Sequence, residues 1–190
     1  MPQVVEIRWH GRGGQGLVVA SEILAEACFL EGKWAQSFPF FGAERRGAPV
    51  QAFTRVSSSP IHIRSMVYNP DIVVVLDPVI YGVIRVSEGL KPGGLIVANS
   101  HFSPSELKSE MSLSNCRVAT LDAVKIATEL GLTVAGLVVP NTAMLGALVK
   151  ASNLAKLESV VKAIQRRWSG KLLEKNLEAV KRGYDEVKLG

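Results

Sequence analysis

The chain has 190 residues, of which 47% are hydrophobic and 21% charged, and its formal net charge is +5. This composition excludes a disordered chain, and two cysteines exclude both a disulfide framework and a Cys/His metal cluster. The longest aliphatic runs are far shorter than the ~20 residues that span a bilayer. We therefore expect a protein of the cytoplasm, since residues 1–10 also lack the apolar core of a signal peptide.

The first half of the chain contains strand patterns and one clear helix. A partly alternating apolar run predicts the first strand, and a glycine-rich segment follows it. In chain order, we expect strands at 4–9, 34–38, 50–56 and 61–63, a helix at 17–30 and a loop at 38–49. The last strand is expected to pair back as a hairpin across the turn at 57–60.

The second half alternates strands with helices. The run at 71–76 is continuous and rich in β-branched residues, which is typical of a strand covered on both faces. Asn141 is expected to cap the helix that follows it. In chain order, we expect strands at 71–76, 95–98 and 117–121, helices at 79–88, 123–130 and 141–149, and two amphipathic helices along 157–168 and 173–187.

This order predicts a Rossmann-like, doubly wound α/β fold. We expect a mostly parallel sheet with helices on both faces and additional C-terminal helices. Residues 1–190 form a single domain in this interpretation, with an α/β core at 1–150 and basic C-terminal helices at 151–190. Ligands bind such sheets beyond the carboxyl ends of the strands, where the clusters 11–16, 77–78 and 99–100 fall.

The charge is concentrated at the end of the chain. Residues 150–190 hold ten Lys and Arg against five Asp and Glu, which accounts for the whole excess. A solvated helix face and contact with an acidic partner both explain this pattern. No aromatic interleaving accompanies the basic residues, so we predict no nucleic-acid partner.

A glycine loop follows the first strand. Gly11, Gly13 and Gly16 match G-x-G-x-x-G between a strand and a helix, a context that suits phosphate binding at the helix N-terminus. A dinucleotide site also needs an acid at the end of the second strand, but the nearest candidate, Glu31, precedes that strand. Close strand–helix packing, a phosphate ligand other than NAD and contact with a partner's backbone all remain open.

An aromatic and arginine-rich segment lies in the predicted loop at 38–49. Phe38, Phe40 and Phe41 stand close to Arg45 and Arg46. The phenylalanines either pack back on the sheet or form an interface, since aromatic residues and arginine are enriched at interface hot spots. Arginine is also suited to bidentate contact with phosphate or carboxylate.

Candidate catalytic residues are scarce. His10 borders the glycine loop and is interpreted either as a ligand contact or as a residue that ends a strand. His62 and His101 stand beside no nucleophile motif. Cys28 lies on the apolar face of the first helix, as an inert core residue does. We predict no catalytic residue in this chain and no metal site.

Several motifs together carry a family resemblance. They are GRGGQG at 11–16, FPFFGAERRGAPV at 38–50, DP at 77–78, PNTAMLGA at 140–147 and NLEAVKRGY at 176–184. On these motifs the chain resembles the gamma subunits of the pyruvate:ferredoxin oxidoreductase (pyruvate synthase) family, among the 2-oxoacid:acceptor oxidoreductases. The resemblance extends over nearly the whole chain.

The resemblance implies a subunit of an enzyme that converts pyruvate and coenzyme A to acetyl-CoA, CO2 and reduced ferredoxin. The expected partners are alpha, beta and delta subunits, with ferredoxin only indirectly in contact. Thiamine diphosphate and iron–sulfur clusters would lie in those partners, consistent with a chain of two cysteines. The chain alone would be inactive.

The gamma-type domain is associated with assembly and with the coenzyme A side of the reaction. We therefore expect coenzyme A, or a neighbouring subunit, to contact Gly11, Gly13, Gly14, Gln15, Gly16, Arg45, Arg46 and Asn141. The alternative is an independent nucleotide- or CoA-binding module. An exposed subunit interface also leaves open a homodimer when the chain is isolated.

Overall fold

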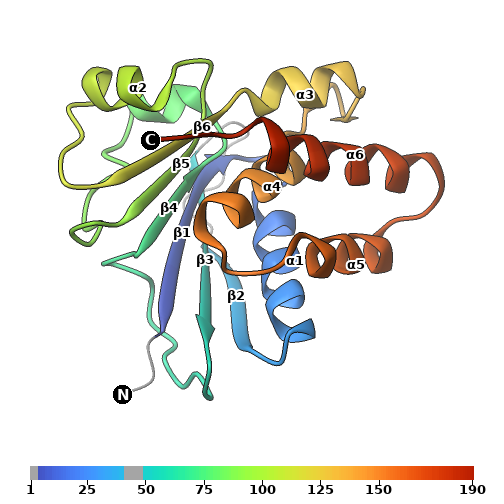
Figure 1. The fold of residues 1–190 in the computed structure, drawn as a ribbon, viewed down its shortest axis with the longest axis horizontal. Helices are drawn as coiled ribbons and strands as arrows, with labels where there is room; N and C mark the ends of the chain where they lie inside the picture. Colours follow the sequence, from blue (N-terminus) through green and yellow to red (C-terminus); the bar gives the residue numbers. More distant parts are fainter. Residues whose placement is uncertain (1–3, 41–48) are drawn as a thin grey trace.

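The computed structural model describes residues 4–40 and 49–190 (Figure 1). Its main sheet has seven strands in the order β2-β3-β1-β4-β5-β6-β9. The four central strands are parallel, and the outer strands pair antiparallel. The strands are β1 (Val5–Arg12), β2 (Trp34–Phe40), β3 (Pro49–Ser57), β4 (Ile72–Val75), β5 (Leu95–Asn99), β6 (Arg117–Leu121) and β9 (Lys188–Leu189). The predicted α/β class and the parallel centre are confirmed.

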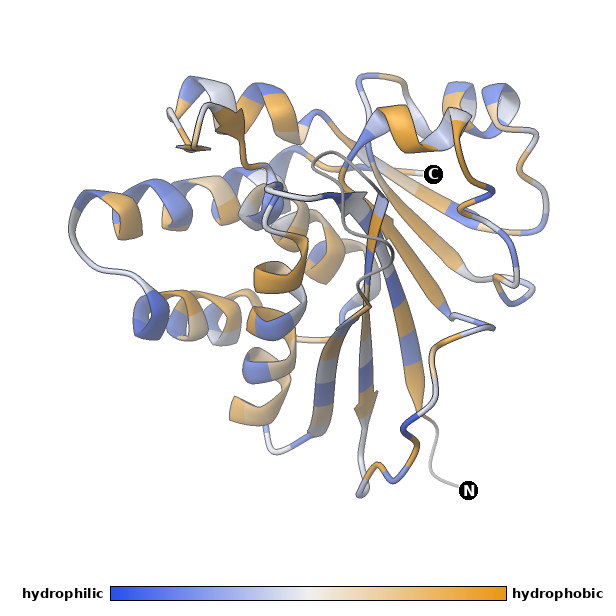
Figure 2. Ribbon diagram, turned by 180° about the vertical axis from the view of Figure 1, so that it is seen from behind, coloured by the Kyte–Doolittle hydropathy of each residue, from blue (hydrophilic) through white to orange (hydrophobic). Residues whose placement is uncertain are grey.

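Helices cover both faces of this sheet, as expected. In β4, Ile72 and Val74 join the larger apolar cluster, whereas Val73 and Val75 join a second cluster on the other face. Hydrophobic stretches run along the central strands (Figure 2). The larger cluster packs under α1 (Leu17–Leu30), α3 (Ala123–Glu129), α4 (Asn141–Ser152), α5 (Leu157–Arg167) and α6 (Gly170–Glu186), and the smaller under the 3-10 helix η1 (Pro78–Gly82) and α2 (Pro104–Glu110).

Helices α4 and α6 are in backbone contact. A Cβ added at Gly146 would collide with the carbonyl of Val180, and one added at Gly183 with the carbonyl of Ala143. Glycine at both positions therefore permits an approach that any side chain would prevent. Beside this contact, the buried Thr142 hydroxyl donates to Oδ1 of Asn176 at 3.0 Å.

Several arginines of the C-terminal helices pair within the chain. Arg166 and Arg167 of α5 contact Glu26 and Glu22 of α1 at 3.2 and 2.8 Å. Arg182 of α6 contacts Glu129 of α3 at 2.8 Å and its own helix neighbour Glu186. Part of the basic excess thus holds α5 and α6 against the core.

Two predicted strand ends were wrong. Strand β1 continues through Gly11 and Arg12, which pair with Val50 and Pro49 of β3, so the loop begins only after Arg12. Strand β2 continues to Phe40 and β3 begins at Pro49, so both ends of the loop predicted at 38–49 belong to strands, and residues 41–48 lie outside the described residues. Pro39 is tolerated in β2 because this strand lies at the sheet edge.

Two predicted elements were also wrong. Residues 61–63 form no strand. Arg55 donates instead to the Ile63 carbonyl at 3.3 Å and to the carbonyl of the nearby Ser65 at 2.7 Å, which holds this segment as a loop. The helix predicted at 79–88 is only the short η1, which begins at Pro78 under the Asp77 cap, and turns follow it. Arg8 donates to the carbonyl of Val86 at 3.0 Å and holds those turns in place.

Four small elements escaped prediction. They are α2, the hairpin of β7 (Thr133–Val134) and β8 (Leu137–Val138), and β9. The two-residue strands show no periodicity to detect. Helix α2, however, opens with a capping box between Ser103 and Glu106, which is visible in sequence. Within the described residues, every helix is too short or too polar to cross a membrane.

Candidate functional site

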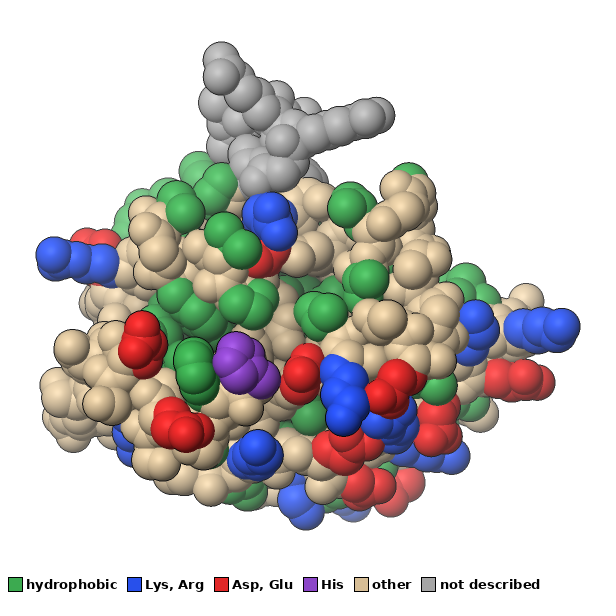
Figure 3. Space-filling model, turned by 90° about the horizontal axis from the view of Figure 1, so that it is seen from above, with side chains coloured by type: hydrophobic (Ala, Val, Ile, Leu, Met, Phe, Trp, Pro, Cys, Tyr) green, Lys and Arg blue, Asp and Glu red, His purple; other side chains and the backbone are tan. Residues whose placement is uncertain are grey.

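A cleft of about 840 Å³ opens at the carboxyl ends of β1 and β4. This is the edge at which ligands bind parallel α/β sheets. Figure 3 looks down on this edge and shows apolar side chains gathered around its hollow centre. The cleft is lined by Arg12, Gly13, Gly14, Gln15, Asp77, Pro78, Val79, Val124, Ala135, Leu137 and Val138.

The glycine loop forms one wall of the cleft through Gly13, Gly14 and Gln15. Gly14 has a φ of 94°, a conformation that suits glycine, and a Cβ there would press on Leu137. The Gln15 side chain folds back into the loop, where its Oε1 accepts from the Arg12 N–H at 2.8 Å. The loop is therefore braced from within.

Asp77 fixes the loop from the end of β4. Its buried carboxylate accepts from Nε of Arg12, from Nε2 of Gln15 at 2.6 Å and from the Val79 N–H at 2.9 Å. Among the described residues, only Nε of the Arg12 guanidinium has a partner, and the side chain is 41% exposed. Asp77 thus orients a partly exposed cation in the cleft.

Asn141 supports the loop from behind. It is the first residue of α4 rather than its cap, a position that Pro140 takes. Its Nδ2 donates to the Gly16 carbonyl at 3.2 Å, and the side chain is almost fully buried. Because Gly16 has a φ of 74° and precedes α1, this bond joins the starts of two helices.

The predicted site residues are thus only partly brought together. Gly13, Gly14 and Gln15 line the cleft, Gly11 lies in β1, and Gly16 and Asn141 lie behind the loop. The predicted contacts Arg45 and Arg46, like Phe41, lie outside the described residues. Sequence reasoning missed Arg12, although it stands inside the quoted motif. The apolar wall was missed too. Val124 lies in the predicted helix α3, but its place at the cleft depends on the fold, and Leu137 lies in the two-residue β8, which shows no sequence pattern.

The third polar cluster, at 99–100, has a structural role. Asn99 Nδ2 donates to the Leu76 carbonyl at 2.8 Å, and its Oδ1 accepts from the Ala123 N–H at 2.9 Å. The side chain is buried and ties β5 to β4 and to the start of α3. Ser100 accepts from the Phe102 N–H in the following turn.

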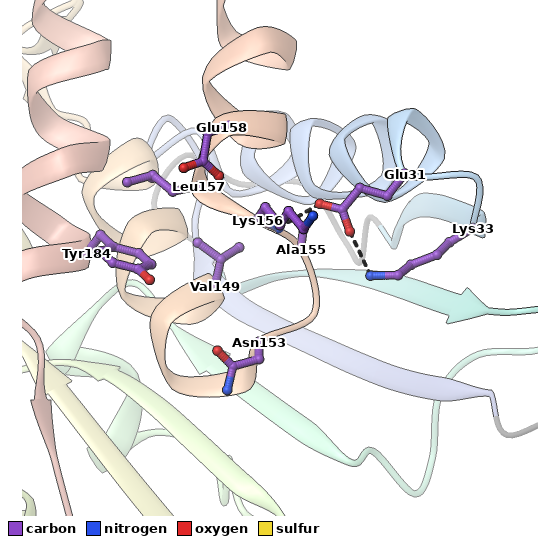
Figure 4. A pocket seen from close by; sticks show the side chains of 9 residues that line it. All are labelled: Glu31, Lys33, Val149, Asn153, Ala155, Lys156, Leu157, Glu158 and Tyr184. Carbon is purple, nitrogen blue, oxygen red and sulfur yellow. Dashed lines mark hydrogen bonds and ion pairs between the residues drawn. The ribbon is translucent and has the colours of Figure 1, made fainter.

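A dinucleotide site lacks its acid in this arrangement. The neighbour of β1 on the side of β2 is the antiparallel β3, so β2 does not end beside the glycine loop. Glu31 lies instead in a separate pocket of about 380 Å³ among α1, α4, α5 and α6 (Figure 4). Its carboxylate accepts from Nζ of Lys33 at 2.8 Å and from the Lys156 N–H at 2.6 Å.

His10 is buried beneath the loop and does not line the cleft. Its Nε2 accepts from Nε of Arg8 at 3.0 Å. Burial, with a smaller contribution from the charge of Arg8, lowers the pKa of His10 to about 3, so the ring is neutral at physiological pH. His10 lies inside β1, which continues to Arg12, so the structure supports neither the ligand contact nor the strand end.

Three comparisons bear on this arrangement. The family described as pyruvate ferredoxin/flavodoxin oxidoreductase matches residues 6–186. The common gamma subunit of the pyruvate/ketoisovalerate oxidoreductases of Pyrococcus furiosus is 47% identical, over 98% of both chains. Subunit PorC of pyruvate synthase from Methanothermobacter thermautotrophicus is 46% identical, over 97% of this chain and 96% of that one.

A solved structure extends the likeness to the fold. The crystal structure of pyruvate oxidoreductase subunit PORC from Thermotoga maritima matches with a TM-score of 0.84 at 36% identity, over 99% of each chain. The likeness thus holds in both sequence and three-dimensional structure across nearly the whole chain.

Proposed function

This chain belongs to the pyruvate ferredoxin/flavodoxin oxidoreductase family, and from that premise we propose how its cleft serves the enzyme. The chain is a gamma-type subunit of a multi-subunit pyruvate (2-oxoacid):ferredoxin oxidoreductase. We propose that it assembles with alpha, beta and delta subunits, and that its cleft receives coenzyme A.

The cleft suits the two chemical halves of coenzyme A. The Arg12 cation lies beside glycine backbone, which allows close approach of phosphate groups. In the same cleft, Val79, Val124 and Leu137 offer apolar side chains to the long pantetheine arm. A volume of about 840 Å³ lies within the usual range for ligand pockets. The juxtaposition of Arg12, glycine backbone and apolar wall carries the proposal.

The electron-transfer cofactors belong in the partner subunits. An iron–sulfur cluster needs four thiolates, and this chain has two cysteines. Cys28 is buried, and burial raises the pKa of its thiol to about 11, whereas Cys116 is only half-buried. These residues do not fit a cluster. We place thiamine diphosphate and the clusters in the partners, which then deliver electrons to ferredoxin.

The choice of 2-oxoacid also belongs to the partners. The relative in Pyrococcus furiosus is a gamma subunit common to pyruvate and ketoisovalerate oxidoreductases. A subunit shared by two such enzymes cannot by itself select between their substrates. By the same reasoning, the cleft of this chain would hold the ligand that both reactions use.

The test is Arg12→Gln in the assembled complex. Loss of a charge-assisted contact to phosphate should raise the KM for coenzyme A by roughly tenfold and leave the KM for pyruvate unchanged. Arg12→Lys should restore part of the affinity. Lys91→Gln is the matched control, because Lys91 is also 41% exposed and also pairs with an aspartate, Asp71, away from the cleft.

Steady-state kinetics with each substrate varied separately would decide the matter. An unchanged KM for coenzyme A in Arg12→Gln would reject the cleft as its phosphate site. Equal losses for both substrates would indicate damaged assembly instead. A third outcome would favour the independent module. The chain alone would then bind coenzyme A, and the complex would keep full activity without this chain.

A further inference from the structure

Strand β2 forms one edge of the main sheet. It runs for seven residues from Trp34 to Phe40, and within the part of the chain that the structure describes it pairs only with β3. An edge strand presents a row of main-chain donors and acceptors to any strand that approaches it. Proteins usually obstruct such edges with charged side chains, but β2 contains none. One obstruction is present, at Pro39.

The ladder shows which main-chain groups of β2 face outward. The carbonyls of Glu6 and His10 accept from the β4 side, so Ile7 and Trp9 bond toward β3. The register carries this alternation across β3. It therefore directs the main-chain N–H and C=O groups of Gln36 and Phe38 toward β3.

The main-chain groups that face outward, away from β3, are therefore those of Ala35, Ser37 and Pro39. Pro39 agrees independently, because a residue without an N–H suits the side that makes no ladder bond. Among the described residues, no hydrogen bond reaches the N–H of Ala35 or Ser37 from beyond this edge. The free edge thus offers the N–H and C=O of Ala35 and Ser37.

We propose that β2 pairs with β2 of a second copy of this chain, antiparallel, across a two-fold axis at Gln36. Ala35 of each copy then lies opposite Ser37 of the other, and each such pair exchanges both of its N–H···O=C bonds. The two seven-stranded sheets become one continuous sheet. A self-complementary patch is what a two-fold dimer requires.

Neighbouring registers satisfy this edge less completely. Centring the axis on Ser37 places Ala35 opposite Pro39, whose missing N–H leaves the Ala35 carbonyl without a donor. Centring it on Ala35 places Ser37 opposite Lys33, whose N–H already donates to the Cys28 carbonyl at 3.1 Å. Only the axis at Gln36 pairs every outward group of Ala35 and Ser37.

Side chains favour the same register. Phe38 stacks on Phe53 of β3, with ring centroids 5.3 Å apart, on the face opposite α1. By alternation Trp34 shares that face, and 52% of it is exposed. In the proposed register Trp34 of each copy lies opposite Phe38 of the other, so the dimer contains two such pairs. Aromatic pairs of this kind stabilise a sheet.

No like charges oppose this pairing. Gln36 faces its own counterpart across the axis, and both are neutral. The nearest charged residue, Lys33, would lie opposite Pro39 and is bound to Glu31 within its own chain. Because β3 separates β2 from β1, the interface also leaves the cleft open, and the inference stands apart from the proposed function.

The oligomeric state of the full chain tests the proposal. Sedimentation velocity over a range of concentrations should show a monomer–dimer equilibrium. Ser37→Pro removes an outward N–H without touching the ladder to β3, and it should weaken dimerisation by roughly tenfold or more. Ser37→Ala is the control, because both variants lose the Ser37–Ser21 hydroxyl bond and only one loses the N–H. A chain that is monomeric throughout would overturn the proposal.

A disulfide reports on the register. Residues opposite each other at a non-hydrogen-bonded position have Cα atoms about 4.5 Å apart, within the range that a disulfide spans. Gln36→Cys should therefore form a covalent dimer on mild oxidation, whereas the wild type, with Cys28 and Cys116, and the exposed-site variant Tyr68→Cys should not. Dimers that fail to cross-link at position 36 would refute this register.

Discussion

At the scale of single residues, a few buried polar side chains satisfy backbone groups and fix segments that no helix or strand holds in place. Asp77 holds two side chains and a backbone N–H at the cleft. Arg55 and Arg8 take up backbone carbonyls of irregular segments that belong to no strand or helix. Such contacts join residues that are far apart in sequence, so no local sequence pattern predicts them. Arg12 was overlooked for this reason, since its role depends on Asp77.

His10 makes the free energy of unfolding depend on pH. Its pKa is about 3 in the folded chain, against about 6.5 when unfolded, because burial disfavours the charged ring. Below pH 6.5 the unfolded chain therefore binds the extra proton, and stability present at neutral pH is lost as the pH falls toward 3. Between pH 7.5 and 5, His10 should lower the free energy of unfolding by about 1–2 kcal/mol.

Urea unfolding at several pH values measures this effect. His10→Gln provides the comparison, since an amide can accept from Arg8 but does not titrate in this range. The difference in unfolding free energy between wild type and variant should change with pH. Parallel pH profiles would show that His10 does not titrate on unfolding.

At the scale of elements, the parts that sequence predicted are those whose signal is local. Strands β4 and β5 are continuous apolar runs, and α5 and α6 carry their apolar stripes within one segment. The two-residue strands β7, β8 and β9 are defined only by their partners. Residues 61–63 have the composition of a strand, yet Arg55 donates to the Ile63 carbonyl and they form none. The capping box of α2 was the one missed signal that sequence did contain.

The contact between α4 and α6 yields a prediction at this scale. Gly146→Ala should lower the free energy of unfolding by about 1–3 kcal/mol or more, because the added methyl meets the backbone of α6 and cannot be accommodated by a side-chain rotation. Chemical denaturation measures it. Gly82→Ala is the matched control, since a Cβ there meets open space. Equal stability of the two variants would contradict the close contact.

At the scale of the whole molecule, the chain is one component of an enzyme. Its cleft is bordered by exposed aliphatic side chains such as Val79 and Leu137, and its described residues contain no group of His, Cys, Asp and Glu able to hold a metal. The proposed role as a coenzyme A-binding subunit needs partners that contribute the remaining chemistry.

An anoxic pull-down with this chain as bait tests the assembly. Larger subunits should co-purify with thiamine diphosphate, iron and dye reduction that depends on both pyruvate and coenzyme A. Recovery of the chain alone, folded and inactive, would argue against an obligate subunit.

The glycine contact between α4 and α6 also has a mechanical consequence. At Gly146 and Gly183 the two helices lie backbone against backbone, so no flexible side chain lies between them there to absorb a relative movement. Helix α4 begins at Asn141, whose side chain donates a hydrogen bond to the Gly16 carbonyl at the start of α1. A load applied to the outer surface of α6 would therefore travel through a stiff pair of helices to the base of the glycine loop, some distance from where it was applied.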